Sequence, residues 1–349
     1  MNEGLRALLG DRFDAVTRVA TPQDERELME AFRILRTHGG ALGHEVTISR
    51  ARLQRIGHID VKSGVVQAGA GVTLMELEEA LRLKDLSLGP ISPSMQPLTV
   101  SDWLEGPWAG LRAMPGGRLE TACLALDALM PDGLRFSSRP SPRSAAGPDL
   151  DQLFLGGEGR FGLLLSATLR VFNRPRAGSE VQYAFDEVGA LLEGVRRSLA
   201  AGVWFDRLVL AHDGGRWTAW GKVIGSADGV ERDLVSAGDA FNAAGGKPMK
   251  PSPEPVALPE NPHEERELSW EDLAAELHAR HVEKLNEGSP GVVALTLWRA
   301  GLESALVEGA TERGLPMRRA PWIRETAETT PLLQALAEAD PNGVMGERP

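Results

Sequence analysis

The feature that most constrains the fold is residues 147–164, which read GPDLDQLFLGGEGRFGLL. The first part predicts a short helix over 149–155, and the glycine-rich residues 156–159 break it. The apolar residues 161–172 then predict a long buried strand. Glycine at such a junction lets another backbone or a flat ligand approach closely. The run on its own is typical of a tight turn from helix to strand, with a ligand-binding loop as the alternative.

The residues before this run predict alternating helices and strands. Residues 22–37 predict an amphipathic helix whose first turn carries acidic residues, which favour the positive end of the helix dipole. Thr73 and Glu76 form a capping-box pattern that opens a helix over 74–83. The other expected elements are strands at 46–48, 56–60 and 65–71, an extended loop at 89–98, and a hairpin of 122–130 with 134–136 around a turn at 131–133.

The character of the sequence changes after Pro175, which predicts a domain boundary between 1–175 and 176–349. Prolines and acidic residues crowd 248–262, which predicts a long exposed loop or linker. The remaining expected elements are strands at 203–210, 217–224 and 292–298 and helices at 228–244, 269–286, 301–313 and 331–338. Because small α and β elements are mixed without repeats, the expected fold class is α+β.

Composition excludes several function classes. The net charge of −11 argues against a general nucleic-acid or anionic-membrane binder, because attraction to phosphate needs a positive surface. The single cysteine, Cys123, excludes an internal disulfide or an iron–sulfur cluster held by this chain, and its apolar neighbours predict a buried structural thiol. No apolar stretch approaches the roughly 18 residues of a membrane span, and the acidic N-terminus is unlike a secretory signal. A cytoplasmic protein is therefore expected.

Further motifs accompany the run 147–164 in a consistent order. They are VQAGAGVTL at 66–74, MPDG at 130–133 and the strand that leads into Arg174-Pro175. Together they resemble the FAD-binding domain of vanillyl-alcohol oxidase and p-cresol methylhydroxylase, the PCMH type. Within that family the sequence looks most like the FAD-binding subunit of bacterial glycolate oxidase and related 2-hydroxyacid dehydrogenases. The resemblance covers about 22–175 and resumes at 332–344.

The resemblance implies an architecture and a cofactor. Residues 1–175 would form two small α/β subdomains with non-covalent FAD between them. Residues 176–349 would form a smaller α+β cap over the isoalloxazine ring. His38 is a candidate for covalent flavin attachment, although a surface histidine at a helix end is the simpler interpretation. His278 and His281 share a predicted helix face without a convincing carboxylate partner, so no metal site is expected.

The resemblance also assigns cofactor contacts to particular residues. Gly162–Leu164 would contact the adenosine end through their backbone. Pro90, Thr99 and Val100 match a loop that passes the pyrophosphate and the flavin. Gly39-Gly40 is either a remnant of the first phosphate loop or the end of a helix. The full expected set is Gly39, Gly40, Pro90, Thr99, Val100, Ser101, Gly110, Gly117, Gly162, Leu163 and Leu164.

Several positions depart from the family pattern. The first phosphate loop is too short between residues 37 and 46, and Ser101-Asp102 replaces a Gly-Gly pair. Asp102 would bring a negative charge toward the pyrophosphate, and two like charges about 4 Å apart at an effective dielectric near 20 cost on the order of 4 kcal/mol. Such departures are typical of a fold that has lost its cofactor, with drift in a functional loop as the alternative.

These observations support two functions. The first is an FAD-binding oxidoreductase subunit of a glycolate oxidase-like 2-hydroxyacid dehydrogenase, in which hydride passes to flavin N5 and electrons pass to a partner. That partner would be a paralogous flavoprotein or an iron–sulfur subunit, because this chain has no second redox centre. The second is a cofactor-less structural or interaction subunit, a pseudoenzyme that keeps the fold. The sequence identifies no catalytic base and no specific substrate.

Overall fold

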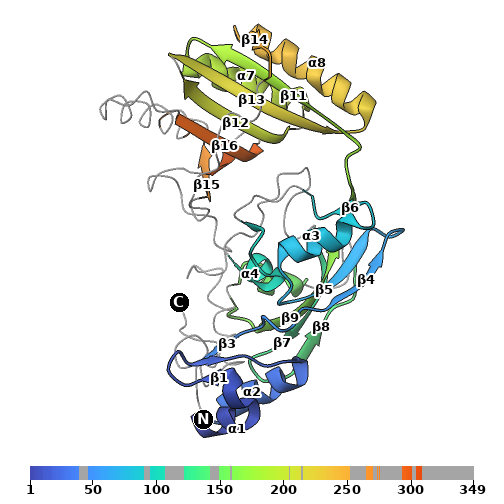
Figure 1. Ribbon diagram of the computed structural model, residues 1–349, viewed down its shortest axis with the longest axis vertical. Coiled ribbons are helices and arrows are strands. Elements are labelled where there is room, and N and C mark those ends of the chain that lie inside the picture. Colours follow the sequence, from blue (N-terminus) through green and yellow to red (C-terminus); the bar gives the residue numbers. More distant parts are fainter. Residues whose placement is uncertain are drawn as a thin grey trace.

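The computed structural model describes residues 1–38, 46–89, 95–106, 122–141, 149–157, 159–203, 205–213, 215–251, 265–269, 273, 275, 293–300 and 304–308. The lower part of Figure 1 contains a three-stranded and a five-stranded sheet from the N-terminal half of the chain. The upper part contains a seven-stranded sheet from the C-terminal half. Helices pack on these mainly antiparallel sheets, so the fold class is α+β.

The first subdomain is built around a small sheet at the base of the molecule (Figure 1). Its elements are α1 (Asn2–Leu9), the 3₁₀ helix η1 (Gly10–Arg12), β1 (Phe13–Asp14), β2 (Val19–Ala20), α2 (Glu25–Thr37) and β3 (Thr47–Ile48). Strand β2 pairs antiparallel with β1 and parallel with β3. Leu28 and Phe32 of α2 are buried in a core that also includes Leu129 and Leu163 of the neighbouring sheet. The two subdomains therefore share apolar packing.

The second subdomain is a five-stranded antiparallel sheet in the order β4-β5-β9-β7-β8. Its strands are β4 (Ile56–Asp60), β5 (Val65–Gly69), β7 (Cys123–Leu129), β8 (Arg135–Ser137) and β9 (Leu163–Arg170). Its helices are α3 (Leu74–Arg82), α4 (Val100–Glu105) and α6 (Asp151–Phe154). Leu77 of α3, Trp103 of α4 and Phe154 of α6 belong to the same core as the sheet residues. Burial of these apolar faces is the main force that holds the helices to the sheet.

The chain leaves this subdomain through a short strand pair. The pair consists of β6 (Leu86–Ser87) and β10 (Phe172–Asn173), which run antiparallel. The next strand, which begins at Ala177, already belongs to the seven-stranded sheet. The chain therefore passes from one sheet to the other between Asn173 and Ala177.

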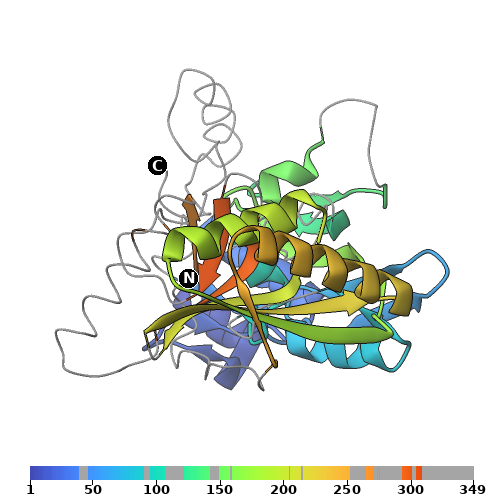
Figure 2. The same cartoon turned by 90° about the horizontal axis from the view of Figure 1, so that it is seen from above.

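The C-terminal sheet has the order β14-β11-β13-β12-β16-β17-β15. Its strands are β11 (Ala177–Phe185), β12 (Phe205–Asp213), β13 (Arg216–Gly225), β14 (Lys247–Met249), β15 (Glu265–Ser269), β16 (Val293–Ala300) and β17 (Ser304–Glu308). Helices α7 (Val188–Ala200) and α8 (Ala227–Ala243) lie side by side on one face of it (Figure 2). Phe185, Trp217 and Phe241 are buried between sheet and helices. Trp217 is thus a core residue.

The structure confirms many predicted elements and corrects others. The helix expected over 301–313 is wrong at 304–308, because these residues form β17, which pairs with β16 on one side and β15 on the other. Long-range strand pairing overrides the local helical pattern there. Helices α1 and α7 and strand β11 were not predicted. The segment 331–338 lies outside the described residues.

Candidate functional site

The expected cofactor residues that the structure describes fall into two groups. Thr99, Val100 and Ser101 form the N-cap and first residues of α4, and Gly162 precedes Leu163 and Leu164, the first residues of β9. Helix α4 packs against β9, so the two groups lie in one region near the centre of the lower part of Figure 1. The other expected residues, Gly39, Gly40, Pro90, Gly110 and Gly117, lie outside the described residues.

The start of α4 is a reciprocal capping box. The Asp102 amide donates to Thr99 Oγ1 at 3.1 Å, and the Thr99 amide donates to the Asp102 carboxylate at 3.1 Å. Thr99 Oγ1 also donates to that carboxylate at 2.6 Å. Asp102 is therefore turned back onto the first turn of its own helix, and the acid at this position has a structural role.

The main-chain donors at the start of α4 are used within the protein. The Thr99 amide is bound by Asp102, the Val100 amide donates to the Val72 carbonyl at 2.8 Å, and the Ser101 amide donates to the Ala70 carbonyl at 3.0 Å. Ser101 is 1% exposed, and its hydroxyl lies 3.0 Å from Thr99 Oγ1. These backbone groups join α4 to the segment that follows β5 and are not directed at a phosphate.

Gly162 is required by the packing of the chain itself. Its φ of 155° lies in a region that other residues rarely adopt. A Cβ at this position would lie 2.6 Å from the Leu129 carbonyl oxygen and 3.0 Å from the Phe154 ring. The glycine-rich turn from helix to strand is thus explained by a close approach of protein backbone, without a ligand.

The two groups are joined by Glu105, the last residue of α4. Its Oε1 accepts a hydrogen bond from the Leu164 amide at 2.9 Å, and its Oε2 forms an ion pair with Arg50 Nη1. Glu105 is only 4% exposed. The sequence analysis missed this residue, although an acid in the otherwise apolar segment WLEG was a signal that could have marked it.

Other candidate residues have ordinary structural surroundings. His38 is exposed, and its Nδ1 lies 2.8 Å from the Ile34 carbonyl, as expected for a histidine at the end of α2. Cys123 is confirmed as a buried thiol, and burial raises its pKa to about 12. Among the described residues, no group of three or more His, Cys, Asp or Glu side chains could hold a metal ion. The same part of the chain contains no helix long and apolar enough to span a membrane.

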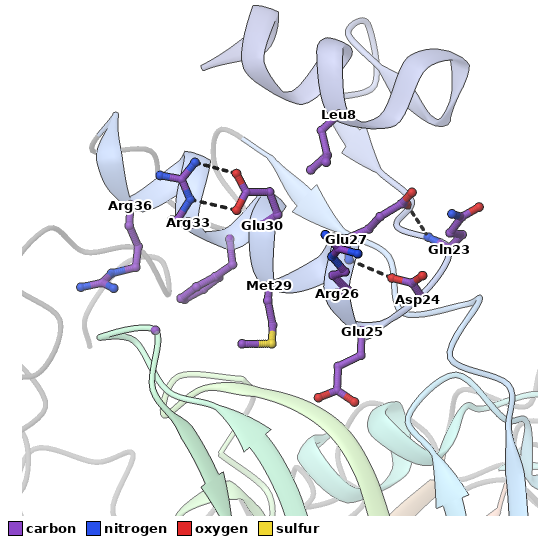
Figure 3. A pocket seen from close by; sticks show the side chains of 12 residues that line it. Leu8, Gln23, Asp24, Glu25, Arg26, Glu27, Met29, Glu30, Arg33 and Arg36 are labelled. Carbon is purple, nitrogen blue, oxygen red and sulfur yellow. Dashed lines mark hydrogen bonds and ion pairs between the residues drawn. The ribbon is translucent and has the colours of Figure 1, made fainter.

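A separate cavity of about 950 Å³ lies between α2 and the turn that joins β7 to β8 (Figure 3). Glu25 and Met29 of α2 point toward the β7–β8 hairpin in Figure 3, and Gly133 of the turn lies close to the Arg36 guanidinium. Glu25 forms an ion pair with Arg135 of β8, which fixes the helix against the hairpin. None of the described residues expected to bind the cofactor lines this cavity.

Several known proteins are similar to this chain in sequence or in fold. Residues 16–137 match the family model described as "FAD binding domain" (FAD_binding_4). The whole fold resembles p-cresol methylhydroxylase, with a TM-score of 0.71 and 11% identity over 99% of this chain and 95% of that one. Residues 16–137 are thus similar to an FAD-binding domain, and the likeness to p-cresol methylhydroxylase is one of fold. An alkyldihydroxyacetonephosphate synthase structure is also similar, with a TM-score of 0.74 and 14% identity over 99% of this chain and 84% of that one.

Curated relatives match this chain over only part of their own length. D-lactate dehydrogenase of Archaeoglobus fulgidus is 27% identical over 174 residues, which are 48% of this chain and 39% of the relative. The FAD-linked oxidoreductase YgcU of Escherichia coli is 28% identical over 191 residues, 51% of this chain and 38% of the relative. Alkyldihydroxyacetonephosphate synthase of Caenorhabditis elegans is 28% identical over 130 residues, 37% of this chain and 22% of the relative. The aligned parts thus span about two-fifths or less of these relatives.

Proposed function

We propose that the chain is an FAD-dependent oxidoreductase subunit that oxidises a 2-hydroxy acid, as a glycolate oxidase-like dehydrogenase does. The observation that carries this proposal is the match of residues 16–137 to an FAD-binding domain. The likeness to a D-lactate dehydrogenase supports the substrate class, because D-lactate is a 2-hydroxy acid. A cytoplasmic location is part of the proposal.

FAD, when bound, would supply the hydride acceptor and the path for electrons to leave the substrate. The chain has one cysteine, so it cannot itself hold an iron–sulfur cluster with four thiolate ligands. We therefore expect electrons to pass to a partner chain, either a paralogous flavoprotein or an iron–sulfur subunit.

Four main-chain amides in the region expected to bind FAD are not free donors for its pyrophosphate. The amides of Thr99, Val100, Ser101 and Leu164 already have acceptors within the protein. A phosphate would have to compete with these bonds, and each one that was broken without replacement would leave a buried group unsatisfied. In this proposal the α4–β9 region therefore borders the FAD site without donating main-chain hydrogen bonds to the pyrophosphate.

The same observation favours a second candidate function, a cofactor-less subunit that uses the fold to hold a partner. A domain that has lost its cofactor would satisfy its former donors internally, which is the arrangement at α4 and β9. In that case the partner chain would carry the redox chemistry.

One experiment separates these candidates. The visible absorption spectrum of the purified protein is recorded before and after incubation with excess FAD and desalting. Retained bands near ~370 and ~450 nm, together with anaerobic bleaching by glycolate or D-lactate, are expected for the oxidoreductase. A protein that stays colourless would contradict FAD binding and support the cofactor-less subunit.

A further inference from the structure

The amide of Leu164 stands where a strand ladder ends. Strand β5 pairs with β9 up to the pair Gly69–Ser166, and the Ala70 amide then donates to the Leu165 carbonyl at 2.9 Å. At Gly71 the chain turns away, because the Gly71 amide donates to the Leu53 carbonyl at 3.1 Å. The Leu164 amide lies just beyond this point of β9, where the register with β7 is also irregular, and its acceptor comes from another element.

The Glu105 carboxylate supplies that acceptor. One of its oxygens binds the Leu164 amide at 2.9 Å, and the other pairs with the Arg50 guanidinium. Leu164 is fully buried, and the Arg50 side chain is only 18% exposed. The Leu164 amide and the Arg50 guanidinium together form a binding site for an anionic group. In this chain the Glu105 carboxylate occupies that site.

This anion-binding site also lies among the residues that the family resemblance predicts to contact the cofactor. Leu164 belongs to the segment expected at the adenosine end of FAD, and Glu105 ends the helix that Thr99 begins. FAD carries a negatively charged pyrophosphate, and a buried carboxylate beside it would repel it while occupying donors that it could use.

We propose that Glu105 is an internal anion that competes with FAD for the Arg50 guanidinium and the Leu164 amide. This inference rests on the proposed FAD-binding function. It predicts that removing the carboxylate lowers the stability of the fold and yet strengthens cofactor binding. A residue with a purely structural role would lower both.

The test compares the wild type with Glu105→Ala and Glu105→Gln. FAD, ADP and riboflavin are titrated into each full-length protein by calorimetry, and folding is monitored by circular dichroism. We expect Glu105→Ala to bind FAD and ADP about tenfold more tightly than the wild type, roughly the effect of one charged hydrogen bond. Riboflavin, which lacks the diphosphate, should bind with unchanged affinity. Glu105→Gln, which keeps the volume and loses the charge, should lie in between.

Glu78→Ala is the matched control. Glu78 of α3 also accepts a main-chain amide, that of Leu88, together with the Ser87 hydroxyl at 3.0 Å. Its loss should lower stability without tightening FAD binding.

If the wild type binds FAD and both Glu105 variants bind it equally or more weakly, the competition is overturned while the proposed function stands. Binding only by the Glu105 variants would support the competition and overturn the proposed function of the wild type. Absence of binding in all of them would overturn both.

Discussion

Helices α3 and α4 begin in the same way and end differently. Their first turns lie next to each other, since Thr73 and Thr99 form an isolated antiparallel bridge, and each threonine heads a capping box. Helix α3 is followed by Leu83, which is 82% exposed. Helix α4 ends at Glu105, whose buried carboxylate binds Arg50 and Leu164. A helix of six residues is too short to be stable alone, so α4 depends on being fixed at both ends.

The largest expected effect comes from releasing the far end of α4. Glu105→Ala leaves the Arg50 guanidinium and the Leu164 amide without an acceptor, and we expect it to lower the free energy of unfolding by about 3–5 kcal/mol. Urea denaturation measures this loss. Glu78→Ala on α3 should cost about 1–3 kcal/mol, because it removes the acceptor of the Leu88 amide and of the Ser87 hydroxyl. Equal losses in the two variants would remove the distinction between the helices.

A somewhat smaller effect is expected from the strand on which α4 rests. Gly162→Ala places a Cβ about 2.6 Å from the Leu129 carbonyl and imposes an unfavourable φ. We expect a loss of about 2–3 kcal/mol. Thermal unfolding followed by circular dichroism would show it as a lower Tm. An unchanged Tm would mean that the backbone approach at Gly162 is not as tight as described.

The two capping boxes should give similar and smaller effects. Asp102→Ala and Glu76→Ala each remove the reciprocal partner of an N-cap threonine, which is worth about 1 kcal/mol. Asp102→Asn and Glu76→Gln, which keep an acceptor oxygen, should recover part of each loss. If Asp102→Ala were instead stabilising, the carboxylate would destabilise the fold, which would contradict the structural role assigned to it at the start of α4.

The smallest expected effect is the pH dependence of the α3 cap. Hydrogen bonds from Thr73 hold the pKa of Glu76 below its ordinary value of 4.5. Because the folded-state pKa is the lower one, this contribution is present above the ordinary pKa and is lost as the pH falls through the folded-state value. The difference in stability between the wild type and Glu76→Gln should therefore shrink below about pH 4.5. A difference that stayed constant from pH 7 to pH 3 would contradict this.

Local patterns were sufficient to predict one of these helices. The spacing of Thr73 and Glu76 predicted α3 and its capping box, and both are confirmed. The same spacing recurs in Thr99 and Asp102, where the family resemblance instead predicts a ligand loop that passes the pyrophosphate. The local rule alone would have predicted the helix start, since an acid at the third position satisfies the N-cap amide in both cases.

The rest of the site depended on contacts between distant parts of the sequence. Glu105 has its role because α4 packs against β9 at Leu164, beyond the last β5–β9 pair, and no local pattern contains that information. The strand β17 was predicted as a helix for a related reason, since its partners lie in β15 and β16. Helix α2, strands β4 and β5 and the β7–β8 hairpin were predictable because their apolar periodicity and turn residues are local.

The single thiol, Cys123, offers a way to measure how often the five-stranded sheet opens. Cys123 begins β7, an inner strand of the five-stranded sheet, and with a pKa of about 12 it is almost entirely protonated at neutral pH. A thiol-specific dye would therefore label the chain only in those moments when β7 separates from its neighbours. The rate of labelling would report how often the sheet opens, from a single native atom and without any mutation.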